Sequence, residues 1–225
     1  MDDVRASSPT TPFASCVDRI ARACVVAVVR APDAERGVAA GEVLAEAGLR
    51  AVEIAFTTPD AARAIERLRE RCPDLLIGAG SVCAASQVGA AHDAGADFLV
   101  SPHHDPALRE AADERGLLHV SGALSPTELL AASADGRPVK LFPGDVGGPA
   151  YLRAVLGPFP ELRAMPTGGV TAANARNWLA AGAFALGAGG DLCSTDLITR
   201  RAYPEIAARA DAWVAATADP SEVAG

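Results

Sequence analysis

The sequence has few aromatic side chains, a single lysine and no long apolar run. Aromatic residues make up 4% of its 225 residues, so side chains on which nucleic-acid bases could stack are scarce. The formal net charge is −8 and the arginines are spread along the chain, so no sustained basic surface is expected for a phosphate backbone. We therefore do not expect nucleic acid as a partner.

Signals for membranes and secretion are also missing. No apolar stretch approaches the roughly 20 residues that are needed to span a bilayer. The first segment, MDDVRASSPTTP, lacks the basic and apolar zones of a signal peptide. The 5 cysteines are odd in number and form no C-x-x-C pair, which argues against a disulfide framework. We expect a cytoplasmic protein with reduced cysteines and no membrane partner.

The sequence offers no clear metal site or cofactor motif. His103 and His104 are adjacent, but no carboxylate recurs at the spacing that a metal site needs. No G-x-G-x-x-G follows the first apolar run, so the main signature of dinucleotide binding is missing. We expect neither a metal nor an organic cofactor.

What the sequence does contain is a regular alternation of short β-branched runs with alanine-rich amphipathic stretches. This alternation is typical of repeated βα units on a parallel sheet. We place eight strands on the runs 24–29, 51–55, 75–79, 98–101, 117–120, 139–142, 162–165 and 183–186. Eight units predict an α/β fold, namely a (β/α)8 TIM barrel that forms a single domain over residues 13–217. Segments 1–12 and 218–225 are predicted to be a flexible N-terminal tail and a C-terminal tail.

Local signals support these boundaries. Thr58-Pro59, Asp105-Pro106 and Ser125-Pro126 each place a capping side chain before a proline, as at a helix N-terminus. Glycine stands just before an expected strand, as a left-handed helix C-cap requires, at Gly48, Gly95, Gly116 and Gly182. An open doubly wound sheet would share much of this pattern, but the missing glycine fingerprint argues against it.

Lys140 is the most informative single residue, because it is the one lysine among 20 lysine and arginine residues. An amine can lose its proton and condense with a carbonyl group, whereas a guanidinium stays charged and cannot act as that nucleophile. Lys140 lies in PVKLFP, inside an expected apolar strand, where desolvation favours the neutral amine. We interpret it as a Schiff-base lysine. The alternative is a lysine left by chance at a strand end.

Glu53 is a carboxylate within the apolar strand AVEIAF. Burying it without a partner is costly, so either a cation pairs with it or the low dielectric raises its pKa for proton transfer. We interpret Glu53 as the general acid and base of the site. A structural salt bridge to an arginine is the alternative.

Other candidates stand at the C-terminal ends of the expected strands, where barrels of this type carry their reacting groups. PTGGVT and GAGGD follow the last two expected strands, where barrels often bind phosphate through backbone N–H groups. Glycine pairs also serve tight turns, so that alternative stays open. The candidate substrate-binding residues are Arg30, Thr57, Ser81, Pro102, Thr167, Gly168, Gly169, Gly189 and Gly190.

Several segments together resemble one enzyme family. The segments AGLRAVEIAFTTP, IGAGSV, VSP, VKLFPGDVGGPAYLRAVLGPFP and MPTGGVTAANARNWLAAGA occur in order between Ala23 and Asp191. They closely resemble the 2-dehydro-3-deoxy-phosphogluconate and 2-dehydro-3-deoxy-6-phosphogalactonate aldolase family. The resemblance implies a barrel, generally assembled as a homotrimer, that cleaves a phosphorylated 2-keto-3-deoxy sugar acid to pyruvate and glyceraldehyde 3-phosphate. Some members of the family accept 4-hydroxy-2-oxoglutarate.

The resemblance also implies roles for single residues. It makes Lys140 the Schiff-base lysine and Glu53 the acid and base. Ser81 preserves the hydroxyl with which relatives hold the pyruvate carboxylate. The segment Thr167 to Gly169 matches the part that binds substrate, with its glycines near the phosphate. Arg30 matches an arginine that many members carry after the first strand.

The chain departs from the family at two positions. Thr57 stands where phosphogluconate-type members have an arginine; the phosphogalactonate type also lacks it, and EIAFTTP, GGPAY and NWLAAGA resemble that type more closely. Arg30 is then expected to hold the carboxylate. Gly190 replaces a phosphate-binding serine, which opens an unphosphorylated substrate as an alternative.

These departures keep two rival functions open. One is a phosphosugar isomerase or epimerase on the same scaffold, which would not need the lysine. The other is a degenerate barrel that binds a sugar acid without catalysis. We rank the class I, Schiff-base aldolase above both.

Overall fold

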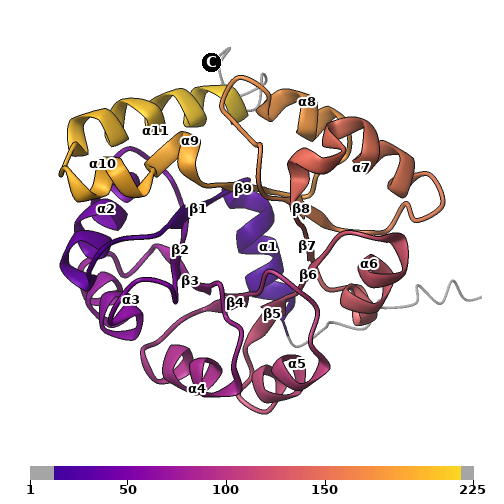
Figure 1. The fold of residues 1–225 in the computed structure, drawn as a ribbon, viewed down its shortest axis with the longest axis horizontal. Coiled ribbons are helices and arrows are strands. Elements are labelled where there is room, and N and C mark those ends of the chain that lie inside the picture. The colour runs from indigo at the N-terminus through magenta and orange to yellow at the C-terminus, as the bar shows by residue number, and fades with distance from the viewer. Residues whose placement is uncertain (1–12, 219–225) are drawn as a thin grey trace, which may run out of the picture.

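The computed structural model describes residues 13–218, and within them short strands alternate with helices (Figure 1). The strands are β1 (Val25–Val29), β2 (Ala51–Ala55), β3 (Leu76–Gly80), β4 (Phe98–Val100), β5 (Leu118–Val120), β6 (Gly122–Ala123), β7 (Val139–Leu141), β8 (Ala164–Pro166) and β9 (Leu186–Ala188). The helices are α1 (Ala14–Ala23), α2 (Ala34–Glu46), α3 (Ala61–Arg71), α4 (Ala85–Asp93), α5 (Pro106–Asp113), α6 (Pro126–Ala132), α7 (Gly148–Leu156), α8 (Ala175–Ala180), α9 (Gly190–Cys193), α10 (Thr195–Thr199) and α11 (Tyr203–Thr217). Two 3-10 turns, η1 (Ala134–Gly136) and η2 (Gly144–Val146), flank β7. The predicted N-terminal tail, 1–12, and all of the predicted C-terminal tail, 218–225, except Ala218 lie outside the described residues.

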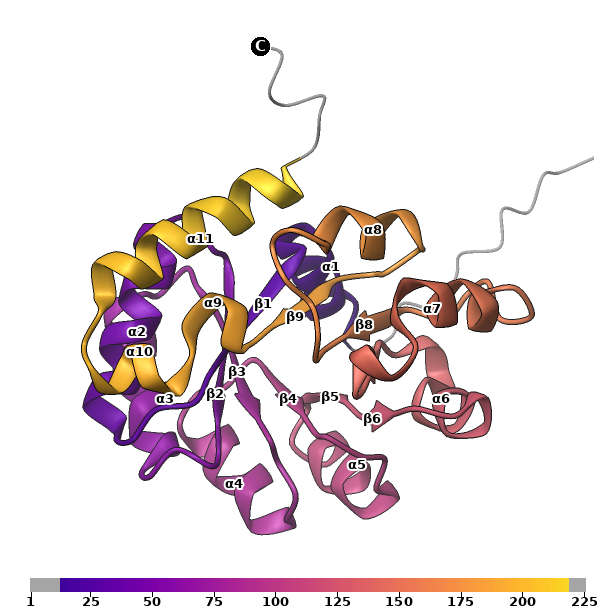
Figure 2. The same cartoon turned by 45° about the horizontal axis from the view of Figure 1, so that its top comes forward.

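All strand pairs are parallel, and the sheet is curled. A 6-stranded sheet runs in the order β5-β4-β3-β2-β1-β9, and a 3-stranded sheet runs in the order β6-β7-β8. Only Ser121 separates β5 from β6, and a bridge between Thr167 and Gly187 connects the end of β8 to β9. Figures 1 and 2 show the strands around a central axis with most helices outside them, whereas α1 lies at the centre of the view in Figure 1. The predicted α/β fold of repeated βα units is confirmed.

The first six predicted strands match β1 to β5 and β7 to within one residue at each end. The last two begin two and three residues later than predicted, because Leu162 donates its N–H to Phe159 and Ala183 donates its N–H to Trp178 in the preceding helix end. These residues close turns and cannot join the ladder until β8 and β9 begin. The short strand β6 was not predicted, because Gly122 and Ala123 carry no β-branched signal.

Alternation along each strand separates two apolar layers. One layer lies inside the ring of strands and includes Val26, Leu76, Phe98 and Met165, with Ile20 of α1 packed against them. The other layer lies between the strands and the outer helices. Residues two apart on a strand share a face, so the side chains nearest the C-terminal ends of the strands either enter the ring or pack under helices. This alternation positions the site.

The capping signals are mostly confirmed. Asp105 accepts the N–H of Ala107 at 2.8 Å at the start of α5. Ser125 and Glu128 form a capping box at the start of α6, with Ser125 N–H donating to Glu128 Oε2 at 2.8 Å. Thr58 does not cap the following helix, which begins at Ala61. Its hydroxyl instead accepts the N–H of Ala31 at 3.0 Å. The prediction that Thr58 caps a helix was wrong, because its hydroxyl bonds to the distant Ala31 N–H instead of to a nearby N–H of the following helix.

The four C-cap glycines all adopt the left-handed conformation that the sequence predicts. Their φ angles are 96° at Gly48, 80° at Gly95, 66° at Gly116 and 96° at Gly182. A side chain at these positions would be strained, so the helix ends are specified by the chain itself. Within the described residues no helix has both the length and the apolar character to cross a bilayer.

A buried polar group lies in the outer layer, under α5. His119 on β5 is 1% exposed, and its Nε2 lies 2.7 Å from Ser101 Oγ, which donates to the carbonyl of Val82 at 2.6 Å. Ser101 has one hydroxyl proton, which it donates to the carbonyl oxygen of Val82. His119 Nε2 must therefore carry a hydrogen and donate it to Ser101 Oγ. Burial, together with the charge of Arg137, lowers the pKa of His119 from 6.5 to about 4. The imidazole is therefore neutral in the folded protein.

Candidate active site

Lys140 and Glu53 both point into the ring of strands. Val139 and Leu141, the neighbours of Lys140 on β7, pack in the outer layer, so the lysine side chain takes the inner face. Ala51, two residues before Glu53 on β2, belongs to the inner layer. Lys140 is 6% exposed and Glu53 is 1% exposed. The two predicted catalytic residues therefore share one buried space.

The carboxyl group of Glu53 is buried without a hydrogen-bond partner. Within the described residues, neither Oε1 nor Oε2 accepts a hydrogen bond. Burial raises the pKa of Glu53, and the positive charges of Lys140 and then Arg30 partly oppose this rise. These opposing effects suit a carboxyl group that must both take and give a proton. The structural salt bridge considered for Glu53 does not form among the described residues.

A glycine on the neighbouring strand makes room for this carboxyl group. A Cβ atom at Gly80, at the end of β3, would lie 2.6 Å from Glu53 Oε1 and 2.9 Å from its Cδ. Real Cβ atoms do not approach other atoms so closely, and Oε1 belongs to a side chain with little free space around it. The sequence analysis did not single out Gly80. Because it lies at the end of the strand next to that of Glu53, a contact between the two residues could have been expected.

The amine of Lys140 has an aromatic neighbour. Its Nζ lies 5.1 Å from the centroid of the Phe142 ring, and within residues 13–218 it makes no salt bridge. The strand neighbours of Lys140 are Gly122 and Met165, neither of which can hold the ammonium as an ion pair. The amine is thus available for chemistry rather than committed to a structural contact. Phe142 was not predicted as part of the site.

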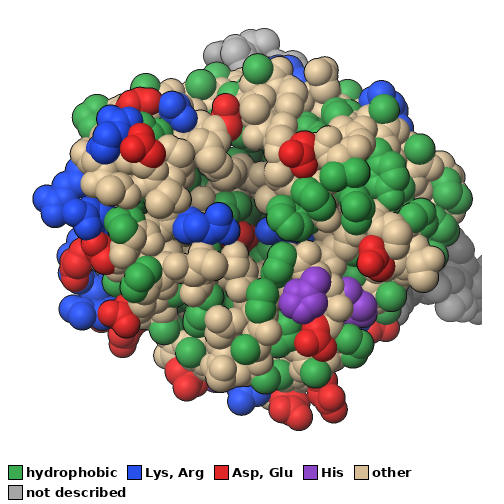
Figure 3. Space-filling view, in the orientation of Figure 1, with side chains coloured by type: hydrophobic (Ala, Val, Ile, Leu, Met, Phe, Trp, Pro, Cys, Tyr) green, Lys and Arg blue, Asp and Glu red, His purple; other side chains and the backbone are tan. Residues whose placement is uncertain are grey.

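Arg30, Thr57 and Ser81 form a polar cluster at the ends of β1, β2 and β3. Arg30 Nε donates to Thr57 Oγ1 at 2.8 Å, and its Nη2 donates to Ser81 Oγ at 3.5 Å. Arg30 is exposed, yet its charge acts on the buried carboxyl of Glu53. Figure 3 shows a hollow in the middle of this face, with Lys or Arg side chains on both sides and an acidic side chain between them. The cluster places a cation and two hydroxyls at the C-terminal ends of the first three strands.

The two glycine segments lie on the opposite side of β1. Thr167 is 7% exposed and follows Met165 on the inner face, and Gly168 and Gly169 have φ angles of 92° and 68°. A Cβ atom at Gly169 would lie 2.6 Å from Cβ of Asp145, so this turn requires glycine. A Cβ atom at Gly189 or Gly190 would meet no heavy atom within 4 Å. The second segment is therefore open, and its glycines serve no close packing within the protein.

Pro102 follows Ser101, whose hydroxyl donates to the carbonyl of Val82, the residue after Ser81. Together with His103 and His104, Pro102 lines a separate pocket of about 350 Å3 at the rim of the same face. Within the described residues, no group of three His, Cys, Asp or Glu side chains could hold a metal ion.

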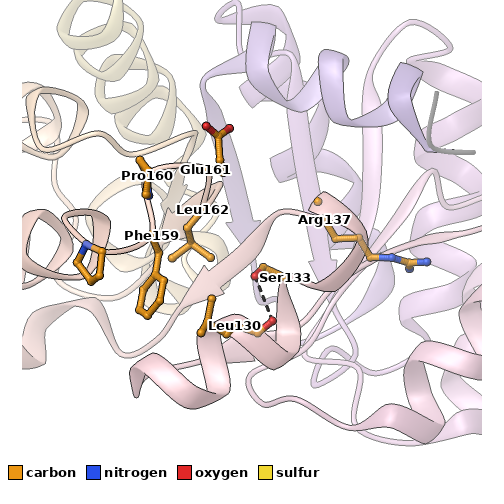
Figure 4. A pocket seen from close by; sticks show the side chains of 9 residues that line it. Leu130, Ser133, Arg137, Phe159, Pro160, Glu161 and Leu162 are labelled. Atoms are coloured by element: carbon orange, nitrogen blue, oxygen red, sulfur yellow. Dashed lines mark hydrogen bonds between the residues drawn. The ribbon is translucent and has the colours of Figure 1, made fainter. Parts of the chain in front are cut away.

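A further pocket, of about 370 Å3, lies at the other end of the strands. Arg137 and Leu162, which line it, come before β7 and β8 in the chain, and Figure 4 shows the Arg137 side chain directed away from Leu130 and Phe159. Arg137 Nη1 instead pairs with Asp113 Oδ1 at 2.8 Å. Reacting groups of such folds lie at the C-terminal ends of the strands, so we leave this pocket out of the site.

Comparison with known proteins agrees with this geometry. The family model described as "KDPG and KHG aldolase" matches residues 17–209. The chain belongs to this family. The abbreviations stand for 2-keto-3-deoxy-6-phosphogluconate and 4-hydroxy-2-oxoglutarate, substrates that the sequence resemblance already indicated.

Individual members of the KDPG and KHG aldolase family support the assignment. The 2-dehydro-3-deoxy-phosphogluconate aldolase of Pseudomonas aeruginosa is 45% identical over 142 residues, which cover 62% of this chain and 64% of that enzyme, somewhat less than two thirds of its length. A probable 2-dehydro-3-deoxy-6-phosphogalactonate aldolase of Rhizobium meliloti is 34% identical over 171 residues, covering 75% of this chain and 81% of that protein. The relatives thus include both the phosphogluconate and the phosphogalactonate type of aldolase. That this chain is more similar to the phosphogalactonate type stays a prediction.

A solved structure shares the fold over most of the chain. The KDPG aldolase of Legionella pneumophila, with pyruvate captured as a covalent carbinolamine intermediate, has a TM-score of 0.80 and 29% identity, and the match covers 91% of this chain and 98% of that one.

Proposed function

We propose that the chain is a class I aldolase that cleaves a 2-keto-3-deoxy sugar acid, carrying a phosphate at C6, to pyruvate and an aldehyde such as glyceraldehyde 3-phosphate. The observation that carries the proposal is one buried amine, Lys140, in the same enclosed space as one buried carboxyl group, Glu53. Membership of an aldolase family agrees with it. Neither a phosphosugar isomerase nor a non-catalytic barrel accounts for a buried lysine without an ion pair.

The chemistry follows from these two side chains. The neutral amine of Lys140 attacks the keto carbon, and loss of water gives an iminium ion that withdraws electrons from the adjacent carbon. Glu53 takes the proton of the hydroxyl group on the carbon that becomes the aldehyde, so the carbon–carbon bond breaks and an enamine remains. Glu53 or a water that it holds returns a proton to the enamine, and hydrolysis releases pyruvate. These reaction steps require no metal and no organic cofactor.

The carboxylate of the substrate belongs beside Arg30 in this proposal. Thr57 and Ser81 each accept a hydrogen bond from the guanidinium and thereby orient it. Because Thr57 stands where phosphogluconate-type relatives carry an arginine, Arg30 is proposed to be the residue that holds the carboxylate. A guanidinium is suited to this task because its donors match the two oxygens of a carboxylate.

The remaining candidates hold the rest of the substrate. Backbone N–H groups of Gly168, Gly169, Gly189 and Gly190 are proposed to receive the phosphate, and Thr167 is proposed to contact the substrate between the phosphate and Lys140. Pro102 is proposed to contact the chain of the substrate on the other side. Turnover of the gluconate and galactonate epimers, each with and without phosphate, tests the subtype and the phosphate site together.

Trapping with borohydride tests the central claim. Incubation with pyruvate and borohydride should reduce the iminium and leave a stable adduct on Lys140, detected by the mass of the peptide that contains it. The Lys140→Arg variant is the matched control, since it keeps the charge and removes the nucleophile. A wild-type protein that gains no mass would contradict the proposal.

We further propose that the curled parallel sheet closes into a barrel. Residues 13–217 form one closed (β/α)8 barrel domain, which the bridge between Thr167 and Gly187 supports. By analogy with the family we also propose a homotrimer that works in the cytoplasm, and light scattering on the purified chain tests the trimer.

A further inference from the structure

A pocket on this face of the molecule is lined partly by Phe142, the aromatic neighbour of Lys140. It measures about 350 Å3 and lies between the loop after β4 and the start of α6, and we call it the histidine pocket. Its lining residues include Pro102, His103, His104, Thr127, Ala131 and Phe142. Phe142 connects it to the site, because its ring lies 5.1 Å from Lys140 Nζ. Figure 3 shows histidine side chains beside the central hollow on the same face.

The position of the pocket relative to Arg30 suggests which part of a substrate it receives. Arg30, Thr57 and Ser81 follow β1, β2 and β3, whereas the histidine pocket is built after β4, β6 and β7. A keto acid bound through its keto carbon to Lys140 directs its carboxylate and its carbon chain to opposite sides of that carbon. With the carboxylate on Arg30, the chain of a substrate without a phosphate can extend toward the pocket, whereas a phosphorylated chain is proposed to reach the glycine segments.

The polar groups of the pocket favour uncharged hydroxyl groups over a phosphate. Among the described residues that line it there is neither Lys nor Arg, while Glu128 contributes a carboxylate. One oxygen of Glu128 is held by Leu124 N–H, Ser125 N–H and the Ser125 hydroxyl, so the negative charge is fixed at the rim. A phosphate there would meet a like charge without a permanent cation.

The same pocket offers hydrogen bonds to hydroxyl groups. The imidazoles and the hydroxyl of Thr127 each can donate and accept. Nδ1 of His104 is buried and has no hydrogen-bond partner within residues 13–218, which is costly unless an occupant supplies one. The apolar wall of Phe142 suits the carbon backbone of a short hydroxylated chain.

We propose that the histidine pocket is a second subsite for the aldehyde half of the reaction, and that it accepts unphosphorylated hydroxyaldehydes. This inference rests on the proposed aldolase function. In the direction of addition, the enamine carbon on Lys140 attacks the aldehyde carbon, and the aldehyde oxygen takes a proton from Glu53 or its water. Hydrolysis of the iminium then consumes one water and returns the free amine.

The test compares two aldehydes in addition to pyruvate. The ratio of kcat/KM for D-glyceraldehyde to that for D-glyceraldehyde 3-phosphate is measured in Ala131→Trp, which fills the histidine pocket from the exposed face of α6. Ala180→Trp is the matched control, because Ala180 is also exposed and lines a pocket on α8. We expect the ratio to fall about tenfold in Ala131→Trp and to stay unchanged in Ala180→Trp.

A second variant keeps the test independent of the bulky substitution. His103→Ala removes an exposed imidazole, and the loss of one hydrogen bond should lower the same ratio about fivefold, with His92→Ala on α4 as control. An unchanged ratio in both pocket variants overturns the subsite. If wild type forms no borohydride-stable adduct with pyruvate, the aldolase proposal fails instead, so the two failures are distinguishable.

Discussion

The contact between Gly80 and Glu53 gives the sharpest prediction about catalysis. A methyl group at position 80 would lie 2.6 Å from Oε1, 2.9 Å from Cδ and 3.2 Å from Cγ of Glu53. Ordinary contacts between such atoms begin at 3.4 Å, so the carboxyl group must move by a large part of an ångström. The backbone of Gly80 is not in the left-handed region, so alanine fits the backbone itself. In Gly80→Ala, the added methyl group should therefore push the carboxyl group of Glu53 out of its position.

The displacement should act on the rate more than on binding. A catalytic group misplaced by about 1 Å can lower the rate about 100-fold, which corresponds to about 2.7 kcal/mol of transition-state stabilisation. We expect kcat for cleavage to fall by about that factor in Gly80→Ala, while KM changes little, because the hydrogen bonds that orient Arg30 go to the side chains of Thr57 and Ser81 and not to Gly80. Steady-state kinetics with coupled detection of pyruvate measures both constants.

A control separates displacement from general damage. Gly89→Ala on α4 adds the same methyl group, whose nearest neighbour would be Arg115 at an ordinary 3.9 Å. It should keep wild-type kinetics, and circular dichroism should show both variants folded. A Gly80→Ala enzyme that is folded and retains the wild-type kcat would refute the argument that the placement of Glu53 limits the reaction.

Three further predictions concern the amine, the clamp and the buried histidine. Lys140→Arg should abolish both pyruvate release and the borohydride adduct, and turnover that survives this change would favour the isomerase reading. Arg30→Met should raise KM about tenfold or more with a smaller change in kcat, since the carboxylate partner is lost; an unchanged KM would place the carboxylate elsewhere. His119 has a folded pKa of about 4 against 6.5, so its stabilising contribution is complete above pH 6.5 and declines toward pH 4, by at most about 3 kcal/mol. Urea unfolding of wild type and His119→Gln across this range should show a steeper loss for wild type, and parallel curves would contradict this origin.

The inner layer of the site was predictable from the sequence because it depends on alternation along strands. Lys140 and Glu53 each sit between apolar neighbours, so a strand that buries those neighbours outward must direct the polar side chain inward. Thr167 was singled out in another way, from its place after an expected strand and from the family resemblance. The clamp was partly predictable, since Arg30, Thr57 and Ser81 each follow a strand, but the bonds from the guanidinium to the two hydroxyls required coordinates.

Contacts made by loops and turns were not predictable in the same way. Thr58 has the local sequence of a helix cap, yet its hydroxyl bonds to Ala31 on another unit, a choice that local propensity cannot show. The place of Phe142 beside Lys140 depends on how the chain leaves β7, and the histidine pocket depends on how two loops pack against each other. Such packing is long-range in sequence, so composition and periodicity carry little information about it.

The reaction and its substrate range are therefore encoded in different parts of the chain. The amine, the carboxyl group and Gly80 are fixed by strand register, and a change in any of them alters the bond-breaking step itself. The groups that would meet the aldehyde half lie in loops and at the start of α9, where His103 and Gly190 can be exchanged without disturbing a buried contact. A family with this division can keep one Schiff-base mechanism while its members diverge in the aldehydes they accept. Swapping the loop after β4 between this chain and a relative should consequently transfer aldehyde preference without transferring or removing the pyruvate adduct.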